Sequence, residues 1–295
     1  MALETTTTTL TELVQAEIVA MTIKAYLIDA NVIIPLCQYA SLAGQGSKVM
    51  SFPLWTKNTA VDITEATAMS NKAFDTSEVS VTVAQVGILR EITDFVAATA
   101  KIGEAALFNA VVQDGVALVT EMLEDDLAAL FASATGATVG TSGSDITIAN
   151  HVEAIAKMRT QRVRGNFVAV YDDQQAFDLM AAVAATTGTP FAGGNVDQSV
   201  LNAGSSGYVG SLMNVPIWMS NLTDTANTAA DVVGSMFADG GTAPEYCAYT
   251  WVELWAPRLR EVVVPGMPSR IVSTTFAYGS AATHPTAAIA MITDA

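Results

Sequence analysis

Residues 47–85 read SKVMSFPLWTKNTAVDITEATAMSNKAFDTSEVSVTVAQ, and the architecture of the chain follows from them. Residues 48–55 predict one strand, and residues 78–85, where apolar and polar side chains alternate, predict a second. A long charged tip, residues 56–77, joins the two. A tip of this length is unusual inside a compact domain, and a hairpin this long does not bury itself. The hairpin therefore needs another surface, and we expect a neighbouring copy of the chain to supply it.

One long helix is predicted directly after the hairpin, from about Phe95 to Ser133. Its apolar residues recur near the helical period, at Ile102, Leu107, Val111, Leu118, Met122, Leu127 and Leu130. Gly136 is a suitable C-terminal stop. Such a helix would extend roughly 50 Å, which is long for a chain of this size and indicates a spine. Gly103 and Gly115 leave open whether the helix is unbroken.

The composition limits the classes of partner. The chain has 295 residues, of which 51% are hydrophobic and 14% charged, with 13 basic and 29 acidic residues and a net charge of −16. The densest basic cluster is Lys157, Arg159, Arg162 and Arg164, which we expect on a solvated helix end. Tight phosphate binding needs more clustered cations than this, so we predict no sequence-specific nucleic-acid binding. Confinement near nucleic acid without tight binding stays open.

The cysteines are expected to be reduced, and no targeting or membrane segment is predicted. Cys37 and Cys247 lie among apolar neighbours and are expected to be two buried thiols in a reducing compartment. No signal peptide is predicted at the start of the chain, and no segment is apolar enough for a transmembrane helix. The run Thr5–Thr9 predicts a flexible arm that becomes ordered on assembly. Pro35 should end or kink any helix in residues 10–43.

The rest of the chain predicts a mixed α/β unit that begins after a Gly/Ser/Thr-rich boundary at residues 136–145. One helix is predicted at about 150–162, and a second runs to about Ala185 after a cap formed by Asp172 and Gln175. Residues 186–207 form a long loop. The predicted strands are 167–171, 208–209, 215–219, 231–238, 247–255, 261–264, 271–278 and 287–292. The fold class is therefore α+β, with the middle half of the chain forming its own subdomain.

Motifs for catalysis are missing from the sequence. His151 and His284 have no partner spacing for zinc, and there is no acyl-hydrolase elbow, phosphate loop or dinucleotide-binding loop. The carboxylates Glu121, Glu124, Asp125 and Asp126 predict a solvated helix face, and Asp172 a helix cap. We therefore predict no catalytic, cofactor-binding or metal-binding residues and no cofactor, and we expect that the chain is not an enzyme.

The order of these parts resembles the major capsid proteins of tailed bacteriophages, the Hong Kong 97-like capsid fold that encapsulins share. Three phrases carry the resemblance: QRVRGNFVAVY at 161–171, GSLMNVPIWMS at 210–220, and the ending FAYG at 276–279 followed by Pro285 and AIAMI at 288–292, which resembles a closing hairpin. The resemblance covers most of the chain. Each phrase alone is weakly specific for this family. The order in which all three occur is more specific than any one of them.

The resemblance implies a division of the chain into four parts. Residues 1–46 would form an N-terminal arm and residues 47–92 the extended two-stranded loop. Residues 93–144 and 251–295 would form a peripheral domain with the long spine helix, and residues 145–250 an axial domain. The short arm leaves no room for a fused scaffold segment, so a separate scaffolding protein or an already processed arm is expected. The lysine–asparagine cross-link of some members is not carried over, because nothing marks an asparagine partner for Lys57 or Lys72.

The function that the resemblance implies is an icosahedral shell around double-stranded DNA, built from pentamers and hexamers of this chain. Scaffolding, portal and decoration proteins are further candidate partners, packaged DNA would be near but not specifically bound, and no membrane is involved. The protein would reside in the virion after assembly in the host bacterial cytoplasm. Two alternatives stay open: an encapsulin-like compartment that encloses a cargo enzyme, and a soluble α+β enzyme with a site between its two halves.

Overall fold

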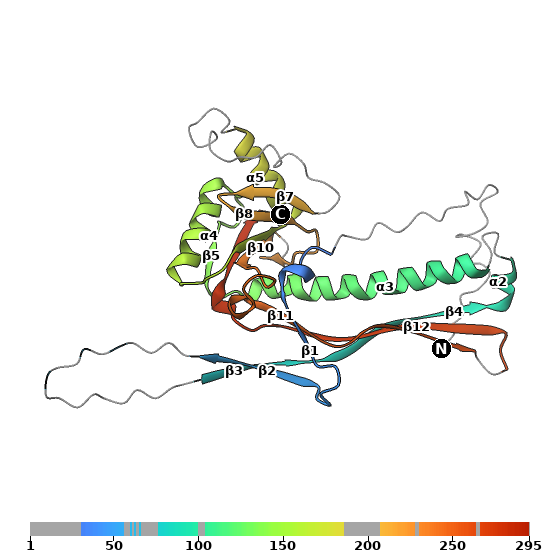
Figure 1. Ribbon diagram of the computed structural model, residues 1–295. Coiled ribbons are helices and arrows are strands. Elements are labelled where there is room, and N and C mark those ends of the chain that lie inside the picture. Colours follow the sequence, from blue (N-terminus) through green and yellow to red (C-terminus); the bar gives the residue numbers. More distant parts are fainter. Residues whose placement is uncertain are drawn as a thin grey trace.

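The computed structural model describes residues 31–55, 60, 62, 65, 76–99, 104–185, 207–227, 230–263 and 266–294. A four-stranded sheet carries a long helix on one face, a second sheet lies beside one end of that helix, and a two-stranded hairpin extends away from both (Figure 1). The hairpin and the far end of the long helix extend in opposite directions. The class is α+β, as the sequence predicts.

The first sheet is built around a long antiparallel ribbon. Its strands lie in the order β1 (Gln38–Ser41), β11 (Tyr249–Val263), β12 (Ser269–Ala282) and β4 (Ala84–Thr93). The two expected strands at 247–255 and 261–264 form one strand, β11, with register shifts between Glu253 and Arg258 that let a single strand bend along the ribbon. β1 runs parallel to β11, and the sequence did not predict it.

The predicted spine is present as two described helices, α2 (Asp94–Thr99) and α3 (Glu104–Ala129), followed by a 3-10 turn, Leu130–Ser133. The 26 residues of α3 extend roughly 40 Å. α3 passes through Gly115 without a break, because it packs closely on the first sheet there: a Cβ at Gly115 would lie 2.6 Å from Oγ1 of Thr274. An ion pair between Arg90 of β4 and Asp114 fixes the helix on the same face.

The predicted hairpin is confirmed. β2 (Val49–Trp55) pairs antiparallel with β3 (Thr76–Thr82), so that Val49 faces Thr82 and Trp55 faces Thr76. Most of the charged tip lies outside the described residues. The chain continues from β3 into β4, which pairs with β12 from Ala84 to Thr93. The segment after β3 is therefore a strand of the first sheet.

The base of the hairpin is covered by its own chain, which corrects the expectation that the chain lacks a surface for it. Val81 is buried in a cluster with Leu42, Val252 and Ala277, and Met50 and Phe52 pack against this cluster. β3 approaches β12 so closely that a Cβ at Gly279 would lie 2.4 Å from the carbonyl oxygen of Thr82. The outer part of the hairpin extends beyond this cluster.

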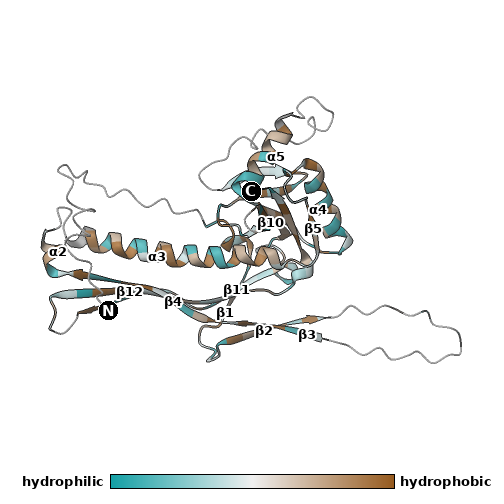
Figure 2. Ribbon diagram, turned by 180° about the vertical axis from the view of Figure 1, so that it is seen from behind, coloured by the Kyte–Doolittle hydropathy of each residue, from teal (hydrophilic) through white to brown (hydrophobic). Residues whose placement is uncertain are grey.

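The second sheet has seven strands. Six lie in the order β5 (Ala137–Val139), β13 (Ala288–Asp294), β10 (Asp231–Ala238), β6 (Phe167–Tyr171), β8 (Val215–Met219) and β7 (Tyr208–Leu212), and β9 (Thr225–Ala226) pairs with β10. Every residue of β10 is buried, which fits its mostly apolar sequence. Figure 2 shows hydrophobic residues along the strands around β10 and alternating hydrophilic and hydrophobic bands along α3.

Local signals in this half are largely confirmed. The strands at 167–171, 215–219 and 231–238 have the predicted bounds. The helix α5 (Asp173–Ala185) begins with the predicted cap, in which the backbone N–H of Asp172 donates to the side chain of Gln175. The helix α4 (Ile148–Thr160) starts two residues before the prediction, because Thr147 caps it. The predicted arm at residues 1–9 and all but the last residue of the predicted loop at 186–207 lie outside the described residues.

The predicted closing hairpin is wrong. β12 belongs to the first sheet, whereas β13 pairs with β10 and β5 in the second. The 3-10 turn Pro285–Ala287 separates them and carries the chain from one sheet to the other. The division into peripheral and axial domains stays a prediction, and the second sheet joins strands from both sides of it.

One buried cluster connects the two sheets. Phe131, just after α3, packs against Phe237 of β10 and Tyr249 of β11, with ring centroids 6.0 and 5.3 Å away. Phe237 and Tyr249 are themselves 5.0 Å apart and nearly perpendicular. The core cluster extends from here under α3 to Phe276 of β12. The end of the long helix is therefore anchored at the junction of both sheets.

Candidate assembly interface

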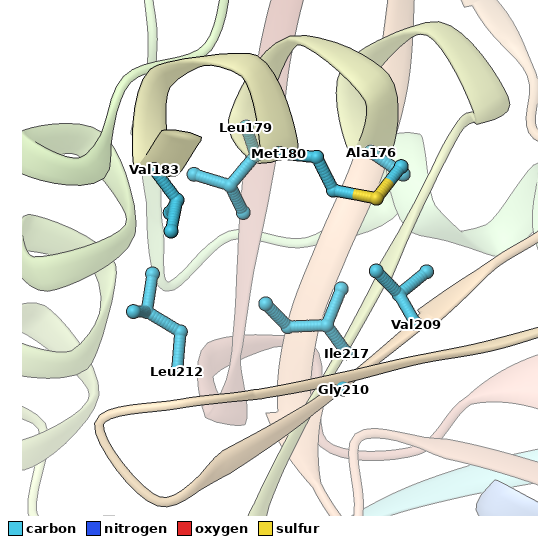
Figure 3. A pocket seen from close by; sticks show the side chains of 8 residues that line it. All are labelled: Ala176, Leu179, Met180, Val183, Val209, Gly210, Leu212 and Ile217. Carbon is cyan, nitrogen blue, oxygen red and sulfur yellow. The ribbon is translucent and has the colours of Figure 1, made fainter. Parts of the chain in front are cut away.

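Chemistry-bearing clusters are absent from the described part of the chain. No group of three or more His, Cys, Asp and Glu residues within it could hold a metal ion. One pocket lies between α5 and the β7–β8 hairpin, where eight apolar residues face one another (Figure 3). The space between them is about 10 Å³, too small for a substrate. This pocket is a small packing gap in the core between α5 and the β7–β8 hairpin.

A larger hollow is an open groove of about 620 Å³ beside β1. Tyr39 and Trp251 form an aromatic pair in its lining, with ring centroids 4.7 Å apart, and Pro35 and Pro244 also line it. Its lining holds no histidine, carboxylate or lysine among the described residues. The groove therefore lacks an acid–base pair.

His151 is buried and fully engaged. Its Nδ1 lies 2.7 Å from the hydroxyl of Tyr171, and its Nε2 lies 3.3 Å from the carbonyl oxygen of Leu212. The neutral ring with a proton on Nε2 satisfies both contacts, since Nε2 donates to the carbonyl and Nδ1 accepts from the hydroxyl. Burial lowers the pKa of His151 to about 4. This histidine supports the second sheet. His284 is engaged locally, since its Nδ1 lies 2.9 Å from the hydroxyl of the neighbouring Thr286.

The cysteines are buried, as predicted. Cys37 and Cys247 are both free thiols in the core cluster that connects the two sheets. Burial raises the pKa of Cys247 to about 11 and that of Cys37 well above its ordinary value. Neither thiol is therefore activated as a nucleophile.

The predicted solvated carboxylate face is wrong for two of its members. Glu124 is buried, and its carboxylate accepts hydrogen bonds from the backbone N–H groups of Val32, Ile33 and Ile34. Asp126 accepts a hydrogen bond from the hydroxyl of Tyr278. The signal for Glu124 was present in the sequence, because it precedes Leu127 and Phe131 by three and seven positions and so shares their helix face.

The outer part of the β2–β3 hairpin exposes apolar and polar side chains on one face. β2 alternates between exposed and half-buried residues, and Trp55 at its end is 73% exposed. Within the described residues β2 and β3 pair only with each other, so each has one edge without a strand partner. An exposed tryptophan beside an open strand edge is typical of a surface that another chain covers.

α3 also exposes apolar side chains beside the face that packs on the first sheet, since Leu118 and Met122 follow Gly115 by three and seven positions. Val119, Leu123 and Leu127 are buried toward the core, whereas Val116, Leu118 and Met122 are exposed. Leu118 and Met122 are one helical turn apart and form a short apolar strip. The long helix therefore keeps an exposed apolar strip, along the border of its contact with the first sheet, that a partner can bury.

This chain is similar to solved structures over almost its whole length. It matches a chain from Mycobacterium phage Che8 with a TM-score of 0.70 and 16% identity, over 94% of this chain and 96% of that chain. The capsid structure of the cyanophage P-SCSP1u gives a TM-score of 0.71 and 13% identity, over 94% and 92%. The capsid of a native GTA particle gives a TM-score of 0.66 and 12% identity, over 94% of this chain and 95% of that chain.

The sequence matches no protein-family model and no curated protein. The likeness is thus one of architecture, carried over nearly the full length of each chain at low identity. This chain has the fold of phage capsid proteins.

Proposed function

We propose that this chain is the major capsid protein of a tailed phage and assembles into an icosahedral shell around double-stranded DNA. The observation that carries the proposal is the fold match over 94% of the chain to a subunit of a cyanophage capsid. The extended hairpin supports it, because its outer part has a large exposed tryptophan and open strand edges. Such a surface gains partners when copies assemble.

The proposed contact places the hairpin of one copy over the long helix of its neighbour. Trp55 would bury its ring against the apolar strip that Leu118 and Met122 form on the neighbour. Met122 is 47% exposed in the single chain. Each such contact is modest, and repetition by symmetry multiplies it. A net charge of −16 lets DNA be packed inside the shell without adhering to it.

The same proposal extends to partners and location. Pentamers and hexamers of the chain would form the shell, with scaffolding, portal and decoration proteins as additional partners. The shell would be part of the virion and would assemble in the host bacterial cytoplasm. Within the described residues, the helices are too short or too polar to cross a membrane.

An encapsulin-like compartment is the alternative from the same fold. The similar structures include phage and GTA capsids, which favours a DNA-enclosing shell over a compartment for a cargo enzyme. A soluble enzyme is the alternative from another class. It would need a polar site in a cleft, and the groove beside β1 has no acid–base pair among its described lining residues.

The test removes the hairpin tip and keeps its base. Because Trp55 faces Thr76 across the hairpin, residues 56–75 can be replaced by Asn-Gly, which fits a two-residue turn. We expect folded subunits, judged by circular dichroism, that form no shells in electron microscopy, with scaffold added if the wild type needs it. Shells of normal size and yield from this variant would contradict the proposal.

A further inference from the structure

Three exposed arginines surround the C-terminal end of α4. Arg159, Arg162 and Arg164 make no ion pair with another residue in the described part of the chain. Lys157, one turn earlier, is different: it pairs with Glu153 at 2.8 Å and donates to the carbonyl oxygen of Thr138. The chain has 29 acidic and only 13 basic residues, so three neighbouring arginines without an ion pair among the described residues are unexpected.

Arg162 holds a backbone conformation that is unfavourable for its type. Its φ is +62°, and it follows α4 at the position that glycine normally fills. The hydrogen bonds of this ending are both present, from the N–H of Val163 to Met158 and from the N–H of Arg162 to Arg159. A glycine would satisfy them with less strain, so the helix ending by itself does not explain an arginine at this position.

The loop that carries the arginines is held from two sides. Gln161 donates a side-chain hydrogen bond to the carbonyl oxygen of Gly136. Gly165 lies against Ala243, where an added Cβ would be 2.5 Å from the alanine methyl group. The N–H of Asp239 donates to the carbonyl oxygen of Asn166. The arginines are therefore presented from a fixed backbone, which reduces the entropy lost on binding.

Three carboxylates gather at the opposite end of the same helix. Asp145 precedes α4 by three residues, and the N–H of Asp294 donates to the carbonyl oxygen of Ser144 beside it. Asp178 of α5 belongs to the same group: partial burial, then the charges of Asp145 and Asp294, raise its pKa. α4 has 13 residues, so the two charged ends are roughly 20 Å apart.

We infer that the arginines at 159, 162 and 164 of one copy dock on the Asp145–Asp178–Asp294 group of the next copy. This inference rests on the proposed shell function and names one contact within its rings. Because the two groups lie at opposite ends of one body, the contact is head-to-tail, the kind that closes into rings. Nucleic acid fits less well, since three arginines would have to attract phosphates against a net charge of −16.

Charge reversal at each end tests the contact. Wild-type shells, scored first by electron microscopy, test the proposed function separately. We expect the Arg162→Glu/Arg164→Glu variant and the Asp145→Arg/Asp178→Arg variant each to lower shell yield by about tenfold or more, since like charges then meet. The variant with all four changes restores the opposite charges and should recover most of the yield. Lys157→Gln, at the same helix end but paired internally, is the matched control and should assemble like the wild type.

Several results would overturn the inference. Wild-type yield from the arginine variant would show that these side chains make no ring contact. Loss in the arginine variant without loss in the aspartate variant, or without recovery in the fourfold variant, would show that the partner is not this carboxylate group. Normal shells that no longer retain DNA would assign the arginines to nucleic acid instead. Circular dichroism of the unassembled subunits separates each of these results from misfolding.

Discussion

Glu124 shows how one side chain can join distant parts of the chain. Its carboxylate lies on α3 and accepts the N–H groups of Val32, Ile33 and Ile34, about 90 residues earlier, where a 3-10 turn begins. The N–H groups at the start of a helical turn have no partner within the turn, and an anion satisfies them well. The residue thereby fixes the point where the N-terminal segment meets the long helix.

Replacement of Glu124 by alanine should destabilise the subunit strongly. Buried backbone donors would lose their acceptor, which costs about 3 kcal/mol or more in the free energy of unfolding. Urea denaturation of unassembled subunits measures this loss. Asp125→Ala, at the exposed neighbouring position, is the control and should change the stability by about 0.5 kcal/mol at most. Equal stability of the two variants would contradict the structural role of Glu124.

His151 should make the stability of the subunit depend on pH. The pKa of His151 is about 4 in the folded chain and 6.5 in the unfolded chain, so the unfolded chain takes up the proton first. Its contribution is fully present above pH 6.5 and is lost as the pH falls through about 4. The full difference is about 3 kcal/mol.

The measurement compares urea midpoints from about pH 7 to about pH 4 for the wild type and for His151→Gln, which hydrogen-bonds but does not titrate. Other carboxylates titrate in both proteins, so the difference between the two curves isolates the histidine. We expect this difference to shrink as the pH falls. A difference that stays constant with pH would contradict the assignment of a neutral buried ring.

At the scale of elements, α3 and the first sheet fit together closely at Gly115, where the helix backbone lies against β12. Gly115 in the middle of α3 costs helix propensity, yet the helix continues because a side chain there would meet Thr274 of β12. The hairpin, the cap of α5 and the continuous apolar strand at residues 167–171 were predictable, since each depends on residues near one another in sequence. The contact between Gly115 and Thr274 was not, since 159 positions separate them.

Gly115→Ala should therefore lower the stability of the wild type. In the Thr274→Ala background the same change should leave the stability unchanged or raise it. In the wild-type background the new methyl group overpacks the interface by about 1–3 kcal/mol, more than the gain of about 1 kcal/mol in helix propensity. Removal of the threonine hydroxyl relieves the contact. A double-mutant cycle in urea should give a coupling energy above about 1 kcal/mol. Additive effects would show that the two elements are not in close contact.

At the scale of the whole molecule, the end of α3 is anchored in a core that both sheets share. Phe131, Phe237 and Tyr249 come from the helix end, the second sheet and the first sheet, and all three are fully buried. A common core makes the two sheets depend on each other, so we expect the described body to unfold in one transition. The hairpin beyond its base has no share in this core among the residues that the structure describes.

Phe131→Ala should lower the stability of both sheets together, by about 3–5 kcal/mol, because it leaves a cavity at their junction. Calorimetry of unassembled subunits, with tryptophan fluorescence as a second probe, measures whether one transition is kept. Phe177→Ala is the control, since Phe177 is 62% exposed on α5. Two separate transitions in the wild type would contradict a shared core.

Local sequence patterns were sufficient for the α+β class, the hairpin, the helix and most strands of the second sheet, because periodicity and capping involve neighbouring residues. The resemblance to phage capsid proteins rested on their order, and the structural matches bear out that fold. The tertiary structure was needed to place β13 in the second sheet, to bury Glu124 and to cover the hairpin base. Each of these depends on which apolar face meets which, and that choice is made between segments far apart in the chain. A pattern along the sequence records that a face is apolar but not what it packs against.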